Sequence, residues 1–286
     1  MEKRIGWILG AIVISVQCIL LYNYFAKYIK EKFKDKDVMY ASDDHMLNIV
    51  NISPFFKKMT EYDLIARNTY SISSYKEQYY DSLEKFSKEE KAVLETLTTE
   101  IDTIPTANLK KIPWKFAKVS QHIENGYPHT RANDIICIPS NMRFPSLEET
   151  LSHEVVHIHQ RNNPAIWERF LNREKWFLES PETIPSRWRE KCRINPDTFQ
   201  KQFWSFKKRF IPLPLFIKDS NVRFDEIKVM YYDLQTGVLE HNTPKEIIDA
   251  YGKDIPQPEH PYEIYAVILG KLYPLSTEKI ERFMSE

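Results

Sequence analysis

The sequence predicts an α+β fold that is mostly helical and is preceded by an N-terminal transmembrane helix. Three observations indicate this class. A long apolar run opens the chain, helical hydrophobic patterns with capping residues recur along it, and short runs of high β-propensity lie between them. With 286 residues, the chain is long enough for one large domain or two modest ones with a sizeable core.

The charge balance and the cysteine content argue against two classes of protein. Lysine and arginine together number 40, as do aspartate and glutamate, so the formal net charge is zero. A general nucleic-acid binder would usually be basic, so we expect no nucleic-acid partner. Three cysteines provide no disulfide framework, which favours a reducing compartment over a secreted, disulfide-bonded protein.

The N-terminal segment is predicted to anchor the protein in a membrane. Ile5–Phe25 is apolar apart from Gln17 and Asn23, and about 20 such residues span a bilayer. A cleaved signal peptide is the alternative, but no small-residue cleavage site follows. We therefore expect a single-pass anchor over residues 1–25 and a juxtamembrane stalk over 26–45. Lysines flank mainly the C-terminal side of the anchor, so the positive-inside rule places the rest of the chain in the cytosol.

The region 46–212 is predicted to contain helices and a small sheet. Two helices are expected between Asp63 and Leu97, and Ser87 with Glu90 caps the second of them. The small sheet is expected within residues 104–139, because runs of high β-propensity alternate there with turn residues.

The remaining sequence is predicted to form further helices and a separate C-terminal part. Residues 164–210 are rich in Trp, Arg and Phe, which favours one or more amphipathic helices. The sequence Pro-Leu-Pro at 212–214 marks a boundary, after which residues 213–286 form the C-terminal part. Two strand-like runs, 215–217 and 228–232, lie near its start.

The most specific feature of the chain is an H-E-x-x-H pattern formed by His153, Glu154 and His157. On a helix, the two histidines lie at i and i+4 on one face, so their imidazoles converge on one point as two zinc ligands must. Glu154 projects beside them, where its carboxylate could take a proton from a zinc-bound water.

The surrounding sequence indicates that the motif lies in the middle of a helix. Ser146 and Glu149 form a capping box at the start, and the sequence Asn-Asn-Pro at 162–164 ends the helix. The apolar residues between these signals are spaced to bury one stripe of the helix. They are Leu147, Leu151, Val155 and Ile158.

A strand at 134–138 followed by an H-E-x-x-H helix resembles the core of the zincin metallopeptidases. The sequence HEVVHIHQR at 153–161 is similar to their H-E-x-x-H-x-x-Q-R variants. The resemblance covers roughly residues 104–275. It implies a zincin-like small sheet with an active-site helix, one zinc ion per chain, and hydrolysis of peptide bonds with Glu154 as the catalytic base.

The subfamilies of zincins differ in the third zinc ligand. The metzincin extension is excluded, because Gln160 and Asn163 stand where its Gly and His would be. In the gluzincin alternative the third ligand is a Glu on a later helix. Glu263 fits, because Pro261 suits the first position of a helix and places Glu263 in the first turn. We therefore expect His153, His157 and Glu263 as the metal ligands.

This assignment departs from one gluzincin pattern, and other residues are alternative candidates for the third ligand. Val267 occupies the place of the Asp found in thermolysin-like enzymes, so another group must orient a histidine ligand. The C-terminal part also contains Glu259, His260 and the more distant His241 as alternative ligands.

Other residues are weaker candidates for the site. Tyr262 and Tyr265 are possible stabilisers of the transition state, as are Tyr231 and Tyr232, although all four are equally consistent with core aromatics. His129 precedes the 134–138 strand and is expected either to line the cleft, as a residue of an edge strand, or to be an ordinary loop histidine.

These observations lead to three functional hypotheses. The first is a membrane-anchored zinc metallopeptidase of the gluzincin type that acts on a peptide or protein substrate. The second is a catalytically inactive, zincin-fold membrane protein that binds a metal or a partner. In the third, the motif is accidental and the chain is a membrane-tethered interaction protein. Zinc stoichiometry separates the third hypothesis from the others, and a peptidase assay separates the first from the second.

Overall fold

The computed structural model describes residues 38–102, 114–143, 147–272, 275 and 277–285. By its internal contacts the chain divides into Met1–Asp37 and Val38–Glu286, and every described residue belongs to the second unit. The predicted transmembrane anchor, most of the stalk and the helix cap Ser146 therefore lie outside the described residues. Among the residues that are described, no helix is both long and apolar enough to cross a bilayer.

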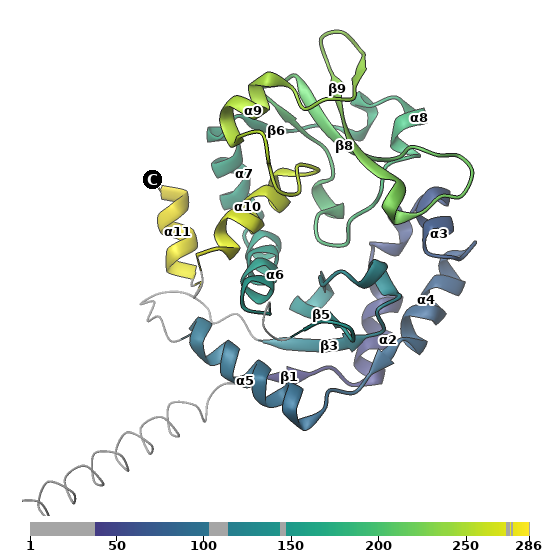
Figure 1. Cartoon of the computed structure of the whole chain (residues 1–286), viewed down its shortest axis with the longest axis vertical. Coiled ribbons are helices and arrows are strands. Elements are labelled where there is room, and N and C mark those ends of the chain that lie inside the picture. Colours follow the sequence, from purple (N-terminus) through teal and green to yellow (C-terminus); the bar gives the residue numbers. More distant parts are fainter. Residues whose placement is uncertain (1–37, 103–113, 144–146, 273–274, 276, 286) are drawn as a thin grey trace, which may run out of the picture. The chain divides into compact units, whose positions relative to one another are not determined.

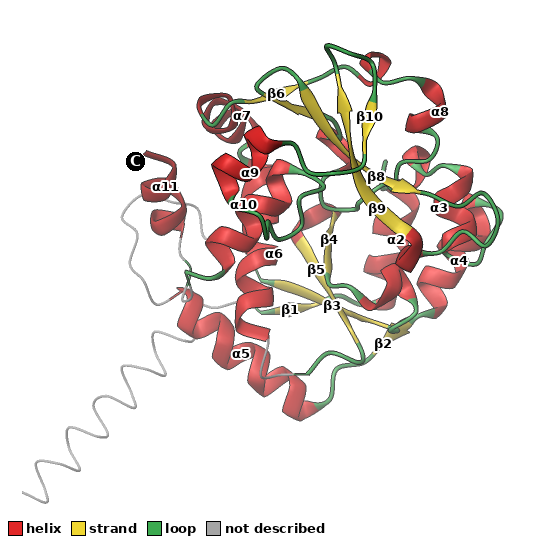
Figure 2. Cartoon of the chain, turned by 45° about the horizontal axis from the view of Figure 1, so that its top comes forward, coloured by secondary structure: helices red, strands yellow, loops and turns green. Residues whose placement is uncertain are grey.

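Val38–Glu286 is a mixed α/β unit in which about half of the residues are helical and two sheets are present (Figure 2). The described helices are α2 (Asp43–Ile52), α3 (Glu61–Ala66), α4 (Ile72–Asp81), α5 (Lys88–Asp102), α6 (Leu147–Asn162), α7 (Pro164–Arg173), α8 (Ser186–Arg189), α9 (Lys245–Tyr251), α10 (Pro261–Gly270) and α11 (Thr277–Ser285).

The first sheet has the strand order β1-β3-β5-β4, and β2 pairs with β3 outside this path. Strands β1, β3 and β5 are parallel to one another, whereas β4 is antiparallel to β5 and forms an edge. The strands are β1 (Met39–Tyr40), β2 (Leu83–Glu84), β3 (Lys115–Val119), β4 (His129–Arg131) and β5 (Ile135–Pro139). Because β1 and the start of α2 fall within residues 26–45, the last part of the predicted stalk belongs instead to the fold.

Helices cover both faces of the first sheet. Alternate side chains of a strand point to opposite faces, so Phe116 and Ile136 face α5 and α6, whereas Ala117 and Cys137 face α2 and α4. The predicted apolar stripe of α6 is confirmed, since all four of its residues are buried in the core that α6 shares with this sheet. They are Leu147, Leu151, Val155 and Ile158.

The second sheet is antiparallel, with the order β10-β9-β8-β7-β6. Its strands are β6 (Trp176–Leu178), β7 (Trp204–Phe206), β8 (Phe210–Phe216), β9 (Ile227–Asp233) and β10 (Leu239–Glu240). The prediction that residues 164–210 form amphipathic helices is therefore correct for α7 but wrong for β6 and β7. Their large aromatic residues pack the inner face of the sheet, as Trp176, Trp204 and Phe206 show.

The predicted boundary at 212–214 is also wrong, because β8 runs through it. Strand β7 pairs with β8 only between Phe206 and Phe210, so from residue 212 onward β8 has a ladder with β9 alone. Pro212 and Pro214 can stand there because the N–H that each lacks would point to the outer edge, where no further strand forms a ladder with β8. Residues 191–193 contact this edge only through a short bridge, in which the Arg193 N–H donates to the Pro214 carbonyl at 2.8 Å and the Phe216 N–H donates to the Lys191 carbonyl at 2.9 Å. The two predicted parts consequently share one core, in which Val156 of α6 packs with residues of the second sheet and α10.

Helix α6 thus lies between the first sheet on one side and α7 and α10 on the other (Figure 1). It contributes to two cores, which fixes its rotation about its own axis. His153, whose side chain belongs to neither core, lines a cavity to which α10 and β4 also contribute residues.

Candidate metal centre

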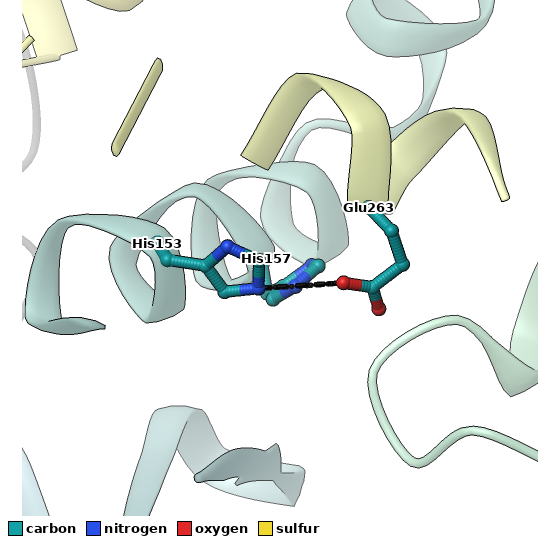
Figure 3. A group of neighbouring side chains, drawn as sticks. All are labelled: His153, His157 and Glu263. Atoms are coloured by element: carbon teal, nitrogen blue, oxygen red, sulfur yellow. Dashed lines mark hydrogen bonds and ion pairs between the residues drawn. The ribbon is translucent and has the colours of Figure 1, made fainter. Parts of the chain in front are cut away.

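The two motif histidines and Glu263 come together from α6 and α10 (Figure 3). The Nε2 atoms of His153 and His157 are 2.9 Å apart. Glu263 Oε2 lies 3.3 Å from each of them. His157 and Glu263 are buried, and His153 is partly open, with 18% of its side chain exposed. Among the described residues, this is the group of His, Cys, Asp and Glu side chains with metal-binding geometry.

The separation of the three ligand atoms fits a zinc ion. Atoms that each lie about 2.0 Å from one tetrahedral zinc are about 3.3 Å from one another. The observed edges of 2.9, 3.3 and 3.3 Å are close to this value. Two neutral imidazoles and one carboxylate are also a ligand set that zinc accepts in hydrolases. The residues present therefore fit the metal that the sequence predicts, with no change in the arrangement of α6 and α10.

Gln160 fixes the orientation of the His157 ring. The Gln160 amide nitrogen donates to the carbonyl oxygen of Tyr262 at 3.0 Å, so its Oε1 must be the atom that faces His157 Nδ1 at 2.8 Å. Oε1 can only accept, so Nδ1 carries a proton and Nε2 faces Glu263. Gln160 thus supplies the contact that a thermolysin-like Asp would provide, and it also connects α6 to α10.

Asn195 orients the Glu263 carboxylate from the opposite side. The Asn195 amide nitrogen donates to Glu263 Oε1 at 2.7 Å, which leaves Oε2 for the imidazoles. The same nitrogen lies 3.2 Å from Glu259 Oε1, and Asn195 Oδ1 accepts from the backbone N–H of Asp197 at 2.9 Å. Asn195 is therefore itself fixed by hydrogen bonds, and it in turn fixes the orientation of the Glu263 carboxylate.

The pKa values of two members of the group are shifted in directions that favour the binding of a cation. Burial alone would raise the pKa of Glu263, but the adjacent imidazoles of His157 and His153 hold it well below its ordinary value. Burial alone would lower the pKa of His157, yet the carboxylates of Glu263 and Asp197 raise it to about 10. The negative charge around His157 thus outweighs the effect of its burial and stabilises a positive charge at this position. A bound divalent cation would be stabilised in the same way.

Glu154 lines the cavity next to the histidines, and one of its carboxylate oxygens has no hydrogen-bond partner. The residue is 3% exposed, and its Oε2 forms no hydrogen bond within the described part of the chain. Burial raises the pKa of Glu154 well above its ordinary value, and the charge of Asp197 adds to this effect. A cavity-lining carboxylate with an increased affinity for protons is suited to take a proton from a water molecule.

The cavity beside these residues has a volume of about 490 Å³. Its walls include His153 and Glu154 of α6, Glu263 of α10, His129 of β4, and residues 195–197 from the loop between α8 and β7. A cavity of this size accommodates several residues of a peptide or a small molecule.

His129 lies on the cavity wall, as one of the two sequence interpretations expected. It is buried in the edge strand β4, with Nδ1 3.0 Å from the Tyr127 carbonyl and Nε2 2.8 Å from the Tyr79 hydroxyl. Burial, together with the charge of Arg131, lowers the pKa of His129 to about 4. Both ring nitrogens are engaged by the protein, so His129 is a neutral wall residue.

The structure does not place the predicted stabilisers Tyr262 and Tyr265 on the cavity. The Tyr262 ring packs 5.9 Å from both Trp167 and Trp204, and the Tyr265 hydroxyl lies 3.2 Å from that of Tyr251. Successive residues of a helix are rotated by about 100°, so turning Glu263 toward the cavity turns these two neighbours into the core.

The two other tyrosines considered from the sequence are also in the interior. Tyr231 and Tyr232 belong to separate core clusters of the second sheet, and neither lines the cavity. Their assignment as core aromatics is therefore the one that the structure supports.

The rival third ligands are engaged elsewhere. His260 caps α10, since its Nδ1 accepts from the backbone N–H of Tyr262 at 3.0 Å, while Nε2 lies 2.7 Å from the Lys201 carbonyl. Glu259 pairs with Arg193 at 3.0 Å. His241 is exposed and is not among the cavity residues.

Sequence reasoning missed Asn195 and Asp197 and assigned no role to Gln160. Gln160 was detectable, because it follows His157 by three positions on a helix and therefore lies on the same side. Asn195 is a loop residue 68 positions from Glu263, and nothing in its local sequence indicates the contact.

Comparisons with models of protein families, with curated proteins and with solved structures found no match to this chain.

Proposed function

We propose that this protein is a zinc-dependent peptidase, held at a membrane by its N-terminal segment. The observation that carries the proposal is the convergence of His153, His157 and Glu263 beside an unpartnered carboxylate, Glu154, in a cavity. Three protein ligands with an open position are typical of catalytic rather than structural zinc sites.

In this proposal His153, His157 and Glu263 would hold the metal. Zinc in such a site supplies Lewis-acid chemistry, which polarises a carbonyl group and makes water a better nucleophile at neutral pH. Gln160 and Asn195 keep two of the ligands in place, so that little reorganisation is needed when the metal binds.

Glu154 moves the proton in the proposed hydrolysis. Its carboxylate takes a proton from the attacking water as the water oxygen bonds to the peptide carbonyl carbon. Glu154 then gives that proton to the peptide nitrogen and the C–N bond breaks, so that a neutral amine leaves, one water is consumed and two chain ends form. The raised pKa of Glu154 helps it to hold the proton between these two steps.

The proposal is tested by zinc analysis and peptidase assays on wild type, Glu154→Gln and Glu149→Gln. Glu149 is an exposed acid at the start of the same helix and controls for a general charge effect. We expect one zinc per chain in all three proteins. Glu154→Gln should lose about 10²–10⁴-fold in kcat, as is typical of a missing general base, whereas Glu149→Gln should stay near wild type.

Each other outcome points to a different function. Zinc binding without hydrolysis of any peptide in a diverse library would favour the metal- or partner-binding alternative. Absence of zinc, after purification without chelators and after incubation with zinc, would remove both metal hypotheses. Loss of zinc in Glu154→Gln would show that Glu154 is a ligand rather than a base.

A further inference from the structure

The segment Arg193–Thr198 lies across the edge of the first sheet next to the metal centre. Its Asp197 carboxylate accepts from the backbone N–H of Thr130 at 2.7 Å and from the Thr130 hydroxyl at 2.5 Å. At its other end, the backbone N–H of Ile194 donates to the buried Asp63 at 3.1 Å. The segment is therefore fixed at both ends.

The contact with Thr130 occupies the edge at which an extended chain could pair. Strand β4 has three residues, and in an antiparallel ladder the N–H groups point alternately toward the partner strand and away from it. Because the Thr130 N–H donates to Asp197, it is the central N–H of β4 that points to the outer edge. A peptide cannot form a main-chain ladder along β4 while Asp197 holds this group.

Two separate cavities lie on either side of the segment. The first, of about 490 Å³, contains the metal centre and His129 at the start of β4. The second, of about 140 Å³, is lined by Arg131 at the end of β4 and by Arg161 at the end of α6. Pro196 lines both. The segment therefore forms a wall between the two cavities, and this wall is the closed end of the cavity that contains the metal centre.

The closed end carries a carboxylate, Asp197, that has no direct ion pair in the described part of the chain. Within the described residues, no Lys or Arg nitrogen forms an ion pair with Asp197, and its hydrogen bonds come from the neutral groups of Thr130. Arg161, whose charge acts on Asp197 at longer range, donates instead to the Thr130 hydroxyl and the Arg131 carbonyl. A substrate group that reaches this end meets a carboxylate, which attracts an ammonium and repels a carboxylate.

We propose that residues 193–198 close the cleft on one side and that Asp197 receives the free α-ammonium group of the substrate, so that the site removes residues from the amino-terminal end of peptides. The inference rests on the peptidase function proposed above and narrows its substrate class. It differs from binding along the whole edge strand, which an internal cleavage site in a long chain would require.

The test compares peptides of one sequence with a free amino terminus, an acetylated amino terminus or an amidated carboxyl terminus. Acetylation removes the charge and adds bulk at the closed end, so kcat/KM should fall by about 10–100-fold, the range of a hydrogen bond to a charged group. Amidation should change kcat/KM by less than about threefold, since it alters the end of the peptide that lies away from Asp197. Mass spectrometry of the products should show release from the amino terminus.

Two substitutions separate the charge of Asp197 from its contact with Thr130. Asp197→Asn keeps an oxygen for the Thr130 N–H and removes the charge, so the preference for a free amino terminus should fall to a few-fold. Asp197→Ala also frees the edge of β4, so acetylated peptides should become better substrates than in wild type. Glu149→Gln, an exposed acid that lines the same cavity, should leave the preference unchanged.

Binding provides a second readout that does not depend on turnover. Zinc-loaded Glu154→Gln should bind the free-amine peptide about 10–100-fold more tightly than the acetylated one, as measured by fluorescence anisotropy. The added Asp197→Asn substitution should remove that difference.

The outcomes distinguish this inference from the function on which it rests. Cleavage of acetylated or backbone-cyclised peptides as fast as free ones would overturn the inference and leave the peptidase in place. An unchanged preference in Asp197→Asn would overturn the role of Asp197. If the zinc-loaded protein neither cleaves nor binds any peptide, the peptidase proposal itself fails and this inference falls with it.

Discussion

Two groups of buried charges contribute to the walls of one cavity, and they are built differently. In the first, which we call the Glu124 network, Glu124 accepts from Arg67 at 2.6 Å and from Arg131 at 2.9 Å. Arg67 also pairs with Asp63 at 2.9 Å, and the Tyr75 hydroxyl donates to Glu124 at 2.9 Å. Two carboxylates and two guanidinium groups therefore balance within the protein itself.

The metal centre shows the opposite arrangement. Glu263 faces two imidazoles, Glu154 has an oxygen without a partner, and Asp197 adds a further negative charge nearby. Both groups are largely buried, and both contain residues with strongly shifted pKa values. The difference is that the charges of the first group balance within the protein, whereas the second would be balanced by the cation that we propose it binds. Shifted pKa values alone therefore do not indicate a functional site, and it is the convergence of ligand atoms in the second group that supports the proposed metal site.

The largest expected effect concerns the third ligand. Glu263→Ala should weaken zinc binding by at least about 10³-fold, more than the 10–100-fold that loss of an outer contact costs. Glu259→Ala removes an acid from the same region that contacts Asn195 but not the imidazoles, so its effect should stay within about tenfold. Competition with a chelator measures both. Equal losses in the two variants would mean that general charge, not ligation, explains zinc binding.

A substitution in the Glu124 network should lower the stability of the protein without changing its metal binding. Glu124→Gln leaves Arg67 and Arg131 buried without their carboxylate, which should lower the free energy of unfolding by about 3–5 kcal/mol. Denaturant unfolding at saturating zinc measures this loss. The zinc content should remain that of wild type. A variant with normal stability but reduced zinc would reverse the roles assigned to the two groups.

The effect of Glu124→Gln should also depend on pH. Burial opposes the charge of Glu124, but Arg67 and Arg131 hold its pKa well below the ordinary value. A lowered folded-state pKa gives stability that is fully present above the unfolded-state value, about 4.3, and is lost as the pH falls below it. The stability difference between wild type and Glu124→Gln should therefore be constant near neutral pH and shrink below about pH 4. A difference that grows in acid would contradict this.

Gln160 should have a smaller effect on the metal centre. Gln160→Met keeps the length of the side chain but removes the acceptor for His157 and the donor to the Tyr262 carbonyl. Zinc affinity should fall by about 10–100-fold. An unchanged affinity would show that packing alone orients the His157 ring.

The smallest expected effect comes from the close approach of α10 to α6. A Cβ atom at Gly270 would lie 3.3 Å from the Glu149 carbonyl oxygen and 3.4 Å from the His153 backbone nitrogen. Gly270→Ala should therefore push the helices apart slightly, and its cost of roughly 1–3 kcal/mol is partly offset by about 1 kcal/mol of improved helix propensity. We expect a net loss of about 1 kcal/mol in unfolding free energy and a few-fold loss in zinc affinity. A more stable variant with normal zinc affinity would show that the space between α6 and α10 accommodates a methyl group at position 270.

The parts of the candidate site whose arrangement the sequence predicted are those with a strong local signal. The spacing of His153 and His157, the apolar stripe of α6 and the Pro before Glu263 each depend on helix geometry, which neighbouring residues determine. The proximity of Glu263 to the histidines followed from resemblance to a family with such a ligand, and the structure brings the three side chains together.

The second sheet and residues 193–198 were not predictable in the same way. Strands β6 and β7 have three residues each, too few to show alternation, and their Trp and Phe residues are as typical of an amphipathic helix. Pro212 and Pro214 normally end a strand, and only the tertiary position of β8 makes them acceptable. Asp197 reaches Thr130 across 67 positions, a distance at which local sequence carries no information.

The link between α6 and α10 has a consequence for the order in which the protein becomes active. Gln160 and the Tyr262 carbonyl, which join the two helices, are 102 positions apart. A growing chain therefore displays both histidines and the acid Glu154 long before Glu263 has been synthesised. Contacts between such distant segments form late, because the closure of a long loop must precede them. Until α10 docks, the proposed enzyme would lack its third ligand, so a partly made or truncated chain would be inert toward the proteins around it.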